Sequence, residues 1–211
     1  MNQRRALSTF AACFFLTSPA ALTEEPEEVA HLYIRAMADA RMNVVADQMH
    51  PSALDRFKGI TTEIAASIES APPERKPPAK MVSALFGDDG LTGVKDLPPR
   101  DVFVRLMSNL TTLVPQIRAM HAGSEYQVLG HVIEGGNLAH VVFRATLAQG
   151  EHEMTKMSVL SLKRDGEHWK VLLTDDLENL VTGLGKRFAA PALPSLPKAP
   201  ANSGPSAKPT R

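Results

Sequence analysis

The stretch that decides the fold is residues 125–174, EYQVLGHVIEGGNLAHVVFRATLAQGEHEMTKMSVLSLKRDGEHWKVLLT. Apolar and polar residues alternate through it in four runs of strand length, the pattern of strands with one buried face. Turn sequences separate the runs at Gly135-Gly136, Gln149-Gly150 and Asp165-Gly166. Because strands joined by short turns pair antiparallel, the stretch predicts a four-stranded antiparallel meander.

The turn between the first two strands sets their register. A two-residue turn at Gly135-Gly136 places His131 opposite His140 and Val128 opposite Phe143. A turn at Gly136-Asn137 moves the register by two residues and leaves the same residues on each face. The buried face is predicted to carry Tyr126, Val128, Val132, Val141, Phe143, Ala145 and Leu147, and the outer face His131, His140 and Arg144.

The second half of the meander gives two further expectations. Residues 152–163 alternate poorly, which predicts a bulge in that strand or burial on both faces. A turn at Asp165-Gly166 places Leu162 beside Trp169 and Leu160 beside Val171.

Helical periodicity dominates the chain before the strands. Pro26, Pro51 and Pro99 each open an apolar stripe at 3.6-residue spacing, and proline is favoured in the first turn of a helix. Pro115 lies within the third stripe, which continues to Ile117, and is expected to kink or divide that helix. A shorter helix is expected to stop at Gly87.

A last amphipathic helix follows the strands. Asp175 and Glu178 have the spacing of a capping box at its start. Gly183 and Gly185 each weaken it by about 1 kcal/mol relative to alanine, so tertiary packing must hold it. The chain therefore predicts an α+β fold: N-terminal helices packed on a curved antiparallel sheet of about four strands, with a C-terminal amphipathic helix.

The two ends of the chain look different from this central domain. Residues 1–20 have the basic start, apolar stretch and small residues of a signal peptide, with cleavage after Ala20. A lipid anchor on Cys13 is the weaker alternative, because apolar residues continue past it. Residues 21–188 form one predicted domain, and residues 189–211, rich in proline, alanine, serine and lysine, a disordered tail. We therefore expect a periplasmic or secreted protein.

Composition narrows the partners. The 23 lysines and arginines balance the 23 acidic residues, which argues against binding to nucleic acid. Cleavage of the signal would remove the only cysteine and leave no integral membrane segment. No motif indicates a cofactor. His131 and His140 are too few for a zinc site, so we predict no metal.

The helix-then-sheet order resembles the NTF2-like superfamily, also called cystatin-like or SnoaL-like. The first helix running into Met49-His50-Pro51 carries the resemblance, together with the strand 139–143 and the ending Gly166-Glu167-His168-Trp169-Lys170-Val171. The resemblance implies a cone-shaped sheet whose interior binds ligands or, in isomerases of the superfamily, holds buried carboxylates and a tyrosine. The extra helices at 52–121 and the last helix depart from the simplest family plan.

Four aromatic residues are the candidates for lining such a pocket: Tyr33, Tyr126, Phe143 and Trp169. The competing interpretation is that they are ordinary core. Three hypotheses for function follow. The first is a non-catalytic module that binds a small apolar ligand or a partner protein in the cone. The second is an isomerase, dehydratase or hydrolase with a buried acid–base group, and the third a structural homodimer associating through the outer sheet face.

Overall fold

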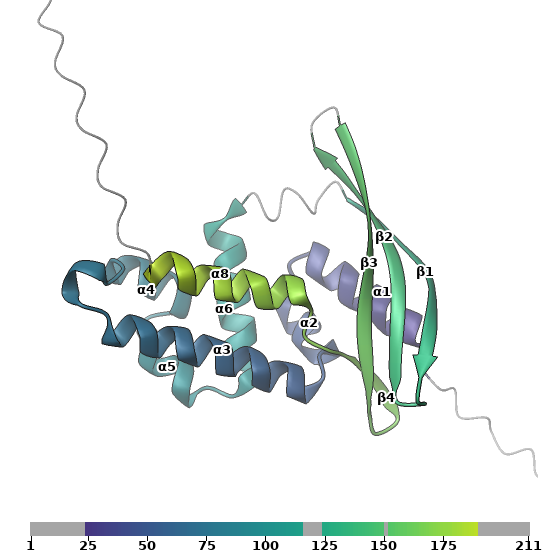
Figure 1. The fold of residues 1–211 in the computed structure, drawn as a ribbon, viewed down its shortest axis with the longest axis horizontal. Coiled ribbons are helices and arrows are strands. Elements are labelled where there is room, and N and C mark those ends of the chain that lie inside the picture. The colour runs from purple at the N-terminus through teal and green to yellow at the C-terminus, as the bar shows by residue number, and fades with distance from the viewer. Residues whose placement is uncertain (1–23, 116–123, 150–151, 190–211) are drawn as a thin grey trace, which may run out of the picture.

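The structure, a computed structural model, describes residues 24–115, 124–149 and 152–189. It confirms the α+β fold: N-terminal helices, a four-stranded antiparallel open sheet and a C-terminal helix (Figure 1). The predicted signal peptide, Ile117 and residues 190–211 of the predicted tail lie outside the described residues.

The three helices predicted to open at Pro26, Pro51 and Pro99 begin at those prolines. The helical part consists of α1 (Pro26–Ala38), α2 (Met42–Gln48), α3 (Pro51–Ser70), the 3-10 turn η1 (Pro73–Arg75), α4 (Ala79–Phe86), α5 (Gly90–Asp96) and α6 (Pro99–Leu113). Helix α6 ends two residues before Pro115, because a proline keeps the residue before it out of the helical region. Helix α4 ends at Gly87, whose φ of +88° suits glycine. Helix α5 forms in a glycine-rich stretch that shows no helical period.

The sheet has the strand order β1 (Glu125–Glu134), β2 (Leu138–Gln149), β3 (His152–Asp165) and β4 (His168–Val171). Helix α1 packs across one face of it, against β1, β2 and β4. The remaining helices form a second group beside the sheet, and α8 (Asp175–Ala189) runs back along that group (Figure 1). The sheet face under α1 is called the inner face below.

The predicted pairing of β1 with β2 is half wrong. Val128 lies opposite Phe143 as expected, but His131 lies opposite Val141 and not opposite His140. The turn has three residues, since Glu134 pairs with Leu138, and a bulge between Val128 and Gly130 absorbs the extra residue. Gly130 has a φ of +151°, which explains why glycine stands at the bulge.

Because of the bulge, the side chains at the end of β1 point to the opposite faces from those predicted. Val132, predicted to be buried, is 63% exposed on the outer face beside His140. His131, predicted to face outward, lies on the inner face, where Glu27 of α1 meets it. A one-residue shift has this effect because side chains alternate along a strand.

Strand β3 also differs from its prediction. It pairs with β2 from end to end without a bulge, so its poor alternation has another cause. Met157 and Val159 point to the outer face and are 57% and 56% exposed. In the last hairpin Leu162 pairs with Val171, because the turn is Gly166-Glu167, one residue later than expected.

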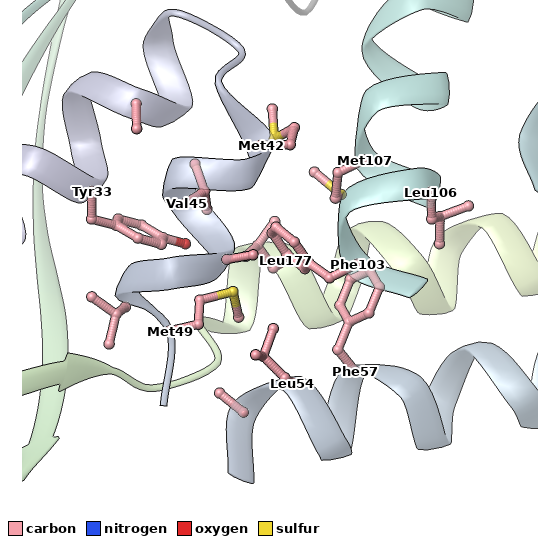
Figure 2. Close-up of a cluster of buried hydrophobic side chains, with 14 of the residues drawn as sticks. Tyr33, Met42, Val45, Met49, Leu54, Phe57, Phe103, Leu106, Met107 and Leu177 are labelled. Atoms are coloured by element: carbon pink, nitrogen blue, oxygen red, sulfur yellow. The ribbon is translucent and has the colours of Figure 1, made fainter. Parts of the chain in front are cut away.

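The core joins the two groups of elements. Figure 2 shows Tyr33 of α1, Met42 and Val45 of α2 and the adjoining Met49 converging with side chains from α3, α6 and α8. Phe57 and Phe103 meet edge to face within it, with ring centroids 4.9 Å apart. A backbone bridge from Met49 to Val171 continues the connection to β4. The sheet and the helical group therefore share one core.

The start of α8 corrects the predicted capping box. The hydroxyl of Thr174 accepts the N–H of Leu177, so Thr174 caps the helix and Asp175 lies inside it. Glu178 does not reach back to the backbone. It accepts two hydrogen bonds from Arg56 of α3, which lower the pKa of the Glu178 carboxyl. The carboxylate joins two helices instead of capping one.

Across the described residues, no helix combines the length and the apolar character needed to cross a bilayer.

Candidate functional site

An open cavity of about 690 Å³ lies between the sheet and the helical group. One wall is β3 with the inner-face residues Phe143, Ala145 and Leu147 of β2. The opposite wall comes from α6 and α8, and α1 and α2 close the end between them. The apolar side chains of the helical walls are Ile34, Met37, Met42, Met107, Leu110, Leu177 and Leu180. This size and lining are typical of sites for small apolar ligands.

Three of the four candidate residues line this cavity. Tyr33 reaches it from α1, Tyr126 from β1 and Phe143 from β2. Trp169 does not line it: the indole is 1% exposed and stacks against Arg164, whose guanidinium lies 4.4 Å from the ring centroid. The structure therefore brings Tyr33, Tyr126 and Phe143 together and places Trp169 in the core under α1.

Burial changes the acidity of both tyrosines. Desolvation raises the pKa of Tyr33 far above its usual value of 10.0. Desolvation also raises the pKa of Tyr126, partly offset by a hydrogen bond with Ser124. Both phenols therefore stay protonated near neutral pH, where they are hydrogen-bonding groups and not bases.

The charged residues of the cavity lie near the start of α8. Asp175 and Asp176 are exposed, and the carboxylate of Asp176 lies 3.6 Å from the ammonium of Lys156 on β3. Thr111 and Ser158 add hydroxyl groups to the lining. The cavity thus combines an apolar interior with a charged mouth.

One cluster in the described residues has the composition of a metal site. Ligand atoms of Glu25, Glu27 and His131 all lie within 4.8 Å of one another. His131 Nδ1 already lies 2.5 Å from Glu27 Oε1, so the two groups satisfy each other without a metal. The cluster also sits at the positive end of α1, which disfavours a cation. We interpret it as a hydrogen-bonded pair of Glu27 and His131 that fixes α1 on the sheet.

The hydrogen bond between Glu27 and His131 predicts a pH-dependent contribution to stability. The hydrogen bond with His131 lowers the pKa of Glu27 below 4.5, so Glu27 binds its proton more weakly in the folded state. Its stabilising effect is then present above pH 4.5 and is lost as the pH falls through the folded-state pKa. We expect Glu27→Gln to lower the free energy of unfolding at pH 7 by about 0.5 kcal/mol and to have less effect near pH 3.

Urea unfolding at both pH values measures this effect. Glu28→Gln is the matched control, since Glu28 is an exposed residue of the same turn. An equal loss at pH 7 and pH 3 in the Glu27 variant would contradict the role of the charge.

The helical wall of the cavity was missed in the sequence. Leu110, Leu177 and Leu180 belong to apolar stripes that look the same whether they face a core or a cavity. Methionine is the weak signal that was present, because Met37, Met42 and Met107 all line the cavity. Of the other methionines between the first helix and the sheet, Met49 is core, Met81 is 47% exposed, and Met120 lies outside the described residues.

Comparison with known proteins adds no assignment. No family model, no curated protein and no solved structure matches the chain significantly. The class that the fold and cavity define is an α+β protein with an open apolar cavity between sheet and helices. Membership of the NTF2-like superfamily stays a prediction.

Proposed function

We propose that this chain is an exported, non-catalytic binding module of the NTF2-like type. Its cavity takes an apolar ligand, either a small molecule or an apolar segment of a partner protein. The observation that carries the proposal is the cavity of about 690 Å³ with apolar side chains on both walls. Its size falls in the range of about 300–1,000 Å³ usual for ligand sites.

The enzymatic alternative finds less support in the same cavity. Acid–base catalysis needs a titratable group that burial and neighbours tune toward neutral pH. Among the described lining residues the carboxylates are Asp175 and Asp176, both exposed, and the two tyrosines have pKa values shifted away from neutrality. The arrangement therefore favours binding over catalysis.

A cavity-filling substitution tests the proposal. Ser158 lies opposite Phe143 on the inner face and lines the cavity, so Ser158→Trp places an indole inside it. We expect the affinity for the apolar fluorescent dye phenylnaphthylamine to fall at least about tenfold, a loss of roughly 1.4 kcal/mol. Fluorescence titration measures the change, and native mass spectrometry of gently purified protein identifies any retained ligand.

The control is Arg144→Trp, which adds the same ring to the exposed outer face one residue from Phe143. Its affinity for the dye should equal that of the wild type, and circular dichroism confirms that both variants fold. Equal dye binding by Ser158→Trp would rule out this cavity as the site.

A homodimer through the outer sheet face is the second candidate. Val132, Met157 and Val159 expose more than half of their surface there. His140 and Arg144 share this face, whereas His131, also expected on it, does not. Sedimentation of a monomer at micromolar concentration would exclude this candidate.

A further inference from the structure

Strand β3 has a free edge along much of its length. Strand β4 pairs only with residues Leu162–Asp165, and β2 occupies the other side of β3. No described strand pairs with the remaining edge at residues 153–160. An edge of this kind presents backbone donors and acceptors that a further strand can use.

One hydrogen bond fixes which residues present those groups. The N–H of Leu172 donates to the carbonyl of Ser161, so the peptide groups of Ser161 point away from β2. The direction alternates along a strand, and β3 pairs with β2 without a bulge. The residues whose N–H and C=O groups face the free edge are therefore Glu153, Thr155, Met157 and Val159.

This free edge borders the cavity. All residues from Lys156 to Leu160 line the cavity. Because these residues include side chains of both strand faces, the edge of β3 is itself part of the wall. Across the cavity stand Met107 and Leu110 of α6 with Leu177 and Leu180 of α8. In Figure 1, β3 is the strand drawn nearest to those helices. Hydrogen-bonding backbone and apolar side chains thus face the same space.

We propose that the occupant of the cavity is an extended peptide segment of a partner protein, which adds to β3 as a fifth strand. Its backbone would bond with Thr155, Met157 and Val159, and alternate apolar side chains would enter the cavity toward Leu110 and Leu177. This inference rests on the proposed function and names the class of ligand.

Two physical arguments favour a peptide over the other occupants. A purely apolar molecule against this edge would strip water from N–H and C=O groups without replacing their hydrogen bonds. A second copy of the whole sheet is too large for the space beside this edge, because α6 and α8 border that space.

The test uses the full chain and a defined probe. The probe is an equimolar mixture of acetylated nine-residue peptides in which leucine, valine or phenylalanine alternates with serine, threonine or asparagine. We expect it to slow hydrogen exchange of the Thr155, Met157 and Val159 amides in NMR spectra by at least about tenfold. N-methylation of every second residue can be placed in two frames, which differ in which alternate N–H groups are blocked. The peptides methylated in the frame whose N–H groups face β3 should bind at least about tenfold more weakly.

A pair of variants repeats the test from the protein side. Thr155→Pro removes one edge N–H and no bond to β2, whereas Thr155→Val keeps that N–H. We expect Thr155→Pro to weaken peptide binding and Thr155→Val to leave it unchanged. The N-methylated peptides supply the same comparison on the wild type if the proline variant does not fold.

The outcomes separate this inference from the proposed function. Unprotected edge amides, or equal binding by N-methylated peptides of both frames, overturn strand addition. If phenylnaphthylamine still binds and is lost in Ser158→Trp, the cavity remains a site for small molecules. Failure of both probes overturns the proposed function as well.

Discussion

Phe57→Ala is expected to lower the free energy of unfolding by about 3–5 kcal/mol, the usual loss for a large buried aromatic side chain. Phe57 has no exposed surface and packs edge to face on Phe103, where α3 meets α6. Alanine would leave a cavity that helices fixed on several sides cannot close. A protein of this size typically has a total stability of only 5–15 kcal/mol, so the loss is a large fraction.

Thermal unfolding should show a midpoint lower by about 10 °C, since each kcal/mol shifts a chain of this length by roughly 2–4 °C. Leu32→Ala is the control, because Leu32 is 40% exposed and should change stability by well under 1 kcal/mol. A midpoint for Phe57→Ala close to that of the control would mean that the helical group does not share the core described here.

Gly185→Ala is expected to destabilise the chain although alanine favours helix. A methyl group on Gly185 would lie 2.8 Å from Cγ1 of Ile64, so α3 and α8 would have to move apart. Overpacking of this kind typically costs about 1–3 kcal/mol, against a helix-propensity gain of about 1 kcal/mol. The glycine that weakens α8 as an isolated helix therefore allows it to dock on α3.

Gly183 is the matched control, because a methyl group there meets no atom within 4 Å. Gly183→Ala should stabilise the protein by up to about 1 kcal/mol, so the two variants differ in sign. Urea unfolding measures both. Combining Gly185→Ala with Ile64→Ala should cost less than the sum of the two single changes, and strict additivity would contradict the steric explanation.

The order of helices and strands could be predicted because it depends on local patterns. Proline at the first turn of α1, α3 and α6 and the two-residue alternation in the strands are properties of neighbouring residues. The faces of β1 could not be predicted from alternation alone, since one extra residue at the bulge exchanges them. Gly130 was the available signal, because an isolated glycine inside a strand often marks a bulge.

The candidate site was predictable in its aromatic part only. Tyr33, Tyr126 and Phe143 meet at one cavity because they lie on apolar faces that turn toward each other. Trp169 belongs to such a face too, but α1 covers it. Whether an apolar residue of such a face packs against another side chain or lines a cavity depends on how the helical group is placed beside the sheet. That placement results from contacts distant in sequence.

The bridge from Met49 to Val171 and the pair of Arg56 with Glu178 each join segments more than 100 residues apart. The first three helices therefore have no complete interior to pack against until β4 and α8 have been synthesised. Contacts of such long sequence separation slow folding, so most of the nascent chain stays unfolded while it is synthesised. A polypeptide that crosses a membrane before it folds, as the proposed export requires, benefits from that delay.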